Sequence, residues 1–123
     1  MPIPVHIVTG ASNSGKSTLI ARLCHERKDW LGLVDRLPAQ ALSNLRPLSA
    51  GCPCCIGKVV LQITLVRALR ETQAVRAFVE LADAGHVTSL EGVLGGESLG
   101  RAVLRSSPIF LPRDCELQAA DLV

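Results

Sequence analysis

The residues best suited to chemistry in this 123-residue sequence fall in two short stretches. Residues 10–17 read Gly-Ala-Ser-Asn-Ser-Gly-Lys-Ser and follow the pattern G-x-x-x-x-G-K-S. Residues 51–55 read Gly-Cys-Pro-Cys-Cys and place three thiols within four positions. The first pattern is typical of loops that hold phosphates, and the second favours metal binding or redox chemistry.

The first stretch has each of the parts that a phosphate loop needs. Gly10 and Gly15 permit backbone conformations and a close approach that a Cβ atom would block. Lys16 is expected to bridge the β- and γ-phosphates, Ser17 to bind Mg²⁺ and Thr18 to reach the α-phosphate. A chance glycine turn before a helix is the alternative, but the motif follows a predicted strand and opens a predicted helix, as a phosphate loop does. The residues expected to bind nucleotide are Gly10, Ser12, Asn13, Ser14, Gly15, Lys16, Ser17 and Thr18.

The cysteine stretch offers a soft metal site. Cys52, Cys54 and Cys55 precede a predicted helix, and thiolates near a helix N-terminus have lowered pKa values and bind Zn²⁺ or a related metal. Three sulfur ligands leave one tetrahedral position open. Two alternatives remain: Cys52 and Cys55 form a C-x-x-C pair that suits redox chemistry, and free cysteines are often small buried residues. We favour the metal site.

The apolar patterning predicts an α/β fold that positions both stretches. Strands alternate with helices, so right-handed crossovers should give a small three-layer domain with a mostly parallel sheet and helices on both faces. Residues 35–48 read as a loop with one short helical or extended piece. The expected strands cover residues 5–8, 30–34, 75–81 and the proline-bracketed 108–112, and the expected helices cover 16–28, 58–71 and 87–99.

Length and composition bound the function. The length fits a single domain, residues 1–123, and a net charge of +2 with 2% aromatic residues argues against nucleic acid as a partner. We see no secretory signal and no apolar run long enough for a membrane helix, so we expect a cytoplasmic protein without a membrane partner. An open sheet has an exposed edge, which leaves homo-oligomers open. His6, inside the first expected strand, is interpreted as a packed histidine, and Cys24 as structural.

A strand, a GxxxxGKS loop and a Gly-Cys-x-Cys-Cys segment before a helix together resemble the CobW-type P-loop GTPases, which are metallochaperones. The resemblance runs from about residue 5 to residue 94 and includes Phe-Val-Glu-Leu-Ala-Asp at residues 78–83. It implies a P-loop NTPase-like fold, GTP or ATP with Mg²⁺ as cofactors, and Zn²⁺ or another transition metal as cargo. It also implies a client metalloprotein as partner and NTP hydrolysis as the activity.

The same resemblance assigns roles to individual residues. Lys16 and Glu80 would be catalytic, with Glu80 holding a water on Mg²⁺ or orienting the attacking water. Ser17 and Asp35 would face Mg²⁺. The transition-metal ligands would be Cys52, Cys54 and Cys55.

The chain also departs from the family pattern. With Glu80 aligned, the family's γ-phosphate-sensing glycine falls on Asp83, and no Asn-Lys-x-Asp or Thr-Lys-x-Asp guanine-reading sequence occurs. The family's C-terminal domain is missing as well, so we interpret the chain as a shortened, divergent member in which GTP preference rests on the resemblance. Two further hypotheses stay open: a non-catalytic metal- and nucleotide-binding module, and a small-molecule P-loop kinase.

Overall fold

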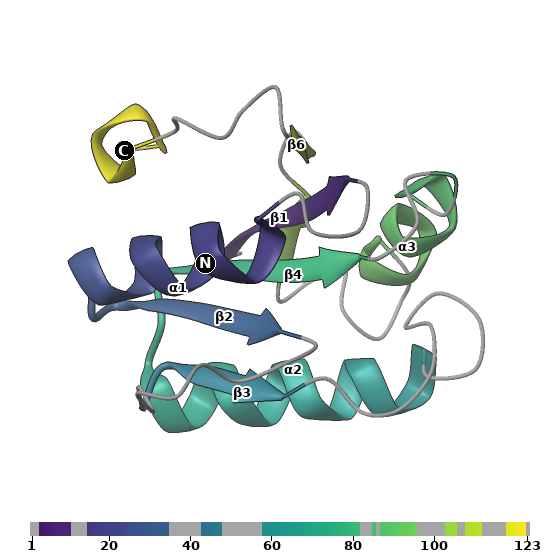
Figure 1. The fold of residues 1–123 in the computed structure, drawn as a ribbon. Helices are drawn as coiled ribbons and strands as arrows, with labels where there is room; N and C mark the ends of the chain where they lie inside the picture. The colour runs from purple at the N-terminus through teal and green to yellow at the C-terminus, as the bar shows by residue number, and fades with distance from the viewer. Residues whose placement is uncertain are drawn as a thin grey trace.

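The computed structural model shows an α/β fold built on one all-parallel sheet (Figure 1). It describes residues 3–10, 15–34, 43–47, 58–81, 85, 87–95, 103–105, 108–111 and 118–122. The elements in chain order are β1 (Ile3–Gly10), α1 (Lys16–Glu26), β2 (Trp30–Val34), β3 (Leu45–Pro47), α2 (Lys58–Thr72), β4 (Arg76–Leu81), α3 (Val87–Leu94), β5 (Val103–Arg105), β6 (Ile109–Leu111) and the 3₁₀-helix η2 (Ala119–Leu122).

The strand order is β3-β2-β4-β1-β5, with β6 also paired to β1. Strand β1 lies between β4 on one side and β5 followed by β6 on the other, so the first strand of the chain is central. All described pairs are parallel, and therefore every strand ends at the same edge of the sheet, which we name the carboxyl edge. The opposite edge is the amino edge.

Helices pack on both faces of the sheet (Figure 1). Because successive strand residues face opposite sides, alternate positions of β1, β2 and β4 feed two separate apolar clusters. One cluster joins the sheet to α1, and the other joins it to α2 and α3. The largest fully buried side chains on the α1 side include Trp30, Phe78, Ile20 and Leu23.

The predicted elements are largely confirmed. Strand β2 has the predicted bounds, and α1, α2, β4 and β6 lie within one or two residues of theirs. Helix α3 ends at Leu94, where Gly95 follows, rather than running on to residue 99. The extended piece expected within residues 35–48 is β3. Strand β5 was not predicted, because three residues carry too little pattern and pair only with Ile3–Val5 of β1. None of the helices in the described ranges is long and apolar enough to span a membrane.

Candidate functional site

The candidate site lies at the carboxyl edge, where β1 ends and α1 begins. Strand β1 ends at Gly10, α1 begins at Lys16, and β4 runs beside β1 and ends at Leu81. The register pairs Val8 with Glu80, so this acidic residue lies one position before the end of the neighbouring strand. The parallel pairing of β1 and β4 thus brings together residues that are 72 positions apart in the sequence, such as Val8 and Glu80.

Gly15 forms the N-cap of α1 in a conformation that suits glycine. Its φ of 92° and ψ of 21° lie in the left-handed region, where a Cβ atom would add strain. Its carbonyl accepts the first helical hydrogen bond from Leu19 N at 2.8 Å. Among the described residues no side chain caps the helix, and its first turn holds no acidic residue, so the helix has no carboxylate in that turn to offset the positive end of its dipole. Such an end favours an anion.

Lys16 lies across the start of the loop. Its side chain is buried, with 8% of the residue exposed, and Nζ donates a hydrogen bond to the Gly10 carbonyl at 3.2 Å. The ammonium group therefore lies beside the end of β1 rather than in open solvent. A partly desolvated cation at this point attracts a phosphate more strongly than a solvated one does.

Ser17 and Glu80 join the helix to the second strand. The Ser17 hydroxyl Oγ donates a hydrogen bond to the Glu80 carboxylate Oε1. Glu80 is 7% exposed, and on β4 it occupies an α1-facing position two residues after Phe78 of the α1-side cluster. A hydroxyl and a carboxylate, both oxygen donors, thus meet next to the lysine, and oxygen donors are what Mg²⁺ prefers. The described donor set fits Mg²⁺.

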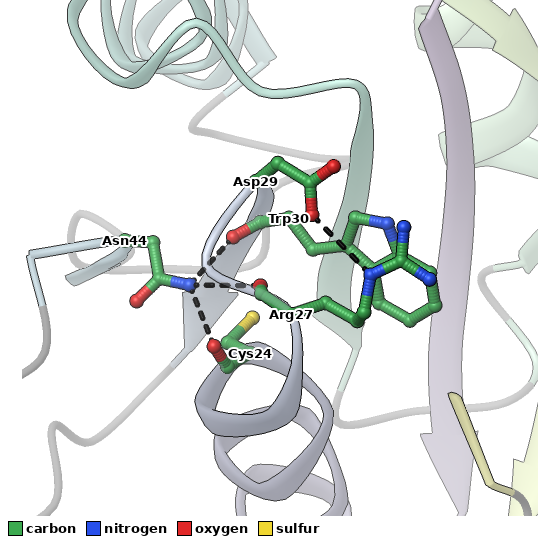
Figure 2. Close-up of polar contacts among 5 residues, drawn as sticks. All are labelled: Cys24, Arg27, Asp29, Trp30 and Asn44. Carbon is green, nitrogen blue, oxygen red and sulfur yellow. Dashed lines mark hydrogen bonds and ion pairs between the residues drawn. The ribbon is translucent and has the colours of Figure 1, made fainter. Parts of the chain in front are cut away.

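A buried asparagine fixes the other end of α1 (Figure 2). Asn44 is 3% exposed, and its Nδ2 donates to the backbone carbonyls of Cys24 at 2.9 Å, Arg27 at 3.4 Å and Trp30 at 2.7 Å. The backbone carbonyl of Asn44 accepts a hydrogen bond from Gly32 N at 2.9 Å. One side chain therefore ties the end of α1 to the start of β2 and to the turn before β3, which sets the axis along which α1 approaches the sheet.

The structure brings together five of the residues predicted from the sequence. Gly10, Gly15, Lys16, Ser17 and Glu80 converge at the carboxyl edge. Thr18 is exposed in the first turn of α1. The remaining predicted residues lie outside the described ranges: Ser12, Asn13, Ser14, Asp35, Cys52, Cys54 and Cys55. Among the residues that the structure does describe, no group of three or more His, Cys, Asp or Glu side chains could hold a metal ion.

The described residues that flank the cysteine stretch lie at the same edge as Gly10 and Lys16. Strand β3 is parallel to β2 and ends at Pro47, and α2 begins at Lys58. Helix α2 then runs back along the sheet, so that β4 can start again from the amino edge (Figure 1). Both flanks therefore lie on the side of the sheet where Gly10 and Glu80 lie.

Two buried polar residues, one at each end of α1, were missed from the sequence. Thr9, the neighbour of Gly10, is fully buried, and its Oγ1 has no hydrogen-bond partner among the described residues. A threonine in an apolar strand carries no signal of its own, because β-branched residues are common in strands. Asn44 lies in a polar loop where asparagine is ordinary, and only the tertiary structure shows that it is buried.

Comparison of the chain with known protein families, with curated proteins and with solved structures found no match.

Proposed function

We propose that this chain binds a nucleoside triphosphate with Mg²⁺ at the carboxyl edge of its sheet, as a P-loop NTPase-like domain with three layers. The observation that carries the proposal is the hydrogen bond from Ser17 Oγ to Glu80 Oε1 at the N-terminus of α1. It joins the last residue of a G-x-x-x-x-G-K-S sequence to an acid near the end of the adjacent parallel strand, 63 residues away. If residues 10–17 were only a chance glycine turn, nothing would require a carboxylate such as Glu80 beside Ser17.

The residues divide the work of phosphate binding between them. The backbone N–H groups of the first turn of α1 have no carbonyl partners within the helix and can donate to phosphate oxygens. Lys16 would move from the Gly10 carbonyl to the β- and γ-phosphates, exchanging a neutral acceptor for a charged one. Ser17 and Glu80 would hold Mg²⁺, Glu80 through a bound water. When bound, Mg²⁺ supplies charge neutralisation at the phosphates.

Equilibrium binding tests this proposal. Fluorescent N-methylanthraniloyl derivatives of GTP and ATP are titrated in Mg²⁺ into wild type, Lys16→Ala and Arg67→Ala, the last being a control at an exposed cation of α2. We expect Lys16→Ala to weaken binding at least tenfold and Arg67→Ala to leave it unchanged, with GTP tighter than ATP. Equal affinity in wild type and Lys16→Ala would refute the site.

We propose further that this nucleotide site controls a transition-metal site at Cys52, Cys54 and Cys55, with a client metalloprotein as recipient, as in the CobW-type GTPases. The position of Pro47 and Lys58 at the carboxyl edge supports it, because nucleotide and thiols would then share one side of the molecule. Zn²⁺ is titrated with and without a non-hydrolysable GTP analogue. Coupling requires that each ligand raises the affinity of the other by the same factor, so identical Zn²⁺ affinities would end this proposal.

Turnover is a separate step of the proposal. Glu80 would help to orient the attacking water once Mg²⁺ and nucleotide replace its hydrogen bond to Ser17. Steady-state phosphate release from GTP, compared between wild type and Lys16→Ala, measures it. If wild type binds nucleotide but releases phosphate no faster than Lys16→Ala does, the result would favour the non-catalytic module.

A further inference from the structure

A second cluster of polar side chains lies at the amino edge, on the side of the sheet opposite to the phosphate loop. Arg27 follows α1, and Arg76 opens β4. Both guanidinium groups lie over the ring of Trp30, with Cζ at 4.9 Å from the ring centroid for Arg27 and 5.4 Å for Arg76. Trp30 is only 1% exposed, so the two cations cover a buried indole (Figure 2 draws Arg27 and Trp30).

The polar partners of Arg76 are neutral. Its Nη1 donates to His6 Nε2 at 2.6 Å, and His6, 6% exposed, is stacked on Phe78 with ring centroids 5.4 Å apart. Arginine can only donate, so Nε2 is the acceptor and the imidazole is neutral in this contact. Within the described ranges no carboxylate pairs with Arg76.

The charge of the two arginines is only partly balanced. Arg27 pairs with Asp29 at 3.4 Å between Nε and Oδ1, and both side chains are well exposed. Among the described residues, the two guanidinium groups thus have one paired carboxylate between them, and the adjacent Lys28 adds a third cation. Burial and the charge of Arg27 lower the pKa of Arg76 below its ordinary value, and among the described residues this guanidinium has no anionic partner.

We propose that Arg27 and Arg76 form a binding site for an oxyanion of the phosphate or carboxylate class at the amino edge of the sheet, distinct from the phosphate loop. Each guanidinium has five N–H donors and uses one nitrogen in the contacts described above, so donors remain for two-pronged recognition of such an anion. Trp30 holds both guanidinium groups against the same indole, which reduces the side-chain entropy lost on binding. The site does not depend on nucleotide binding elsewhere.

Trp30 also supplies the assay, because it is the only tryptophan of the chain and touches both cations. Potassium phosphate and potassium malonate are titrated into the Lys16→Ala protein, which removes the phosphate loop as a competing site, with potassium chloride at matched ionic strength as the reference. We expect a saturable change in Trp30 fluorescence. Saturation by phosphate alone, malonate alone or both assigns the anion class, and all three support the site.

Variants separate a binding site from a structural stack. Arg76→Gln and Arg27→Gln should each lower the affinity for the anion at least tenfold. Arg67→Gln on α2 should leave that affinity unchanged. Asp29→Asn should tighten binding, because it removes the carboxylate that competes for Arg27. Arg76→Lys, which keeps the charge but loses the planar fork, should fall between wild type and Arg76→Gln.

Two results would overturn the proposal. One is a fluorescence change that follows ionic strength equally in phosphate, malonate and chloride. The other is an unchanged midpoint of the anion titration in Arg27→Gln, once thermal melting has shown that this variant folds. The anion should raise the melting temperature of wild type and not of the arginine variants, which provides a readout independent of fluorescence.

Discussion

Replacing Gly32 with alanine should push α1 away from the sheet by a small distance and destabilise the fold. A Cβ atom at Gly32 would meet Ile20 Cγ2 in a severe overlap, Leu45 Cδ2 at 2.7 Å and Cys24 Sγ at 3.2 Å. Ordinary contact begins at 3.4 Å, so Leu45 must withdraw by about 0.7 Å and Ile20 by more. Leu45 can move a methyl group at the end of its side chain. Ile20 cannot rotate away easily, because a β-branched residue in a helix has one strongly preferred χ1 rotamer.

The helix itself must therefore shift, and the cost falls in the range for an overpacked core. We expect Gly32→Ala to lower the free energy of unfolding by about 1–3 kcal/mol. For a chain of this size that is about 4–12 °C in melting temperature. Because α1 carries Lys16 and Ser17, the same shift should lengthen their contacts to Gly10 and Glu80 and weaken nucleotide binding.

Gly92 provides the matched control. It lies in α3, and a Cβ atom there would meet nothing within 4 Å. Gly92→Ala should raise stability by up to about 1 kcal/mol, since alanine is the better helix former. Urea unfolding and nucleotide titration of both variants measure the effects. An unchanged unfolding midpoint in Gly32→Ala, or equal shifts in the two variants, would refute the argument that α1 packs against a required glycine.

Three further changes probe the site and its support. In a double-mutant cycle, Ser17→Ala and Glu80→Ala should show a coupling of about 1.5 kcal/mol in urea unfolding without ligand, since their hydrogen bond involves a charged acceptor. Asn44→Asp should destabilise the fold by about 3 kcal/mol or more, and by more than Asn44→Ala, because a buried carboxylate would face three carbonyl oxygens. Burial raises the pKa of the Cys24 thiol from 9.0 to about 12. Between these two pH values the thiol therefore stays protonated in the folded protein and is deprotonated in the unfolded chain. The resulting stability is complete below pH 9 and is lost as the pH rises toward 12; at pH 10 the loss is about 1.4 kcal/mol.

Each of these predictions has its own control. Additive effects of the Ser17 and Glu80 substitutions would mean that their hydrogen bond adds nothing in solution. An Asn44→Asp protein as stable as Asn44→Ala would show that the amide does not face the carbonyls. For Cys24, urea unfolding at pH 8 and pH 10 is repeated in Cys24→Ala, where the other four cysteines are kept. A pH dependence that is the same in both proteins would assign it to other groups.

The order of strands and helices could be read from the sequence because their signals are local. Apolar runs bounded by glycine or proline placed β1, β2 and β4, and helical spacing placed α1 and α2. The phosphate-loop motif is likewise local, since its glycines, lysine and serine adjoin one another along the chain. A resemblance to CobW-type GTPases singled out Glu80, but not its bond to Ser17. The cysteine ligands and Asp35 lie outside the described residues and stay predictions.

Only the tertiary structure decided which distant residues meet. The pairing of β4 beside β1 delivers Glu80 to Ser17, and no local pattern encodes a pairing across 63 residues. The same holds for Asn44, whose amide joins three carbonyls, and for Gly32, which makes room for α1. These roles depend on packing and on burial of backbone polar groups, which are properties of the assembled sheet. The sequence by itself therefore determined the elements and the G-x-x-x-x-G-K-S pattern, and the assembled sheet determined the neighbours that complete the candidate site.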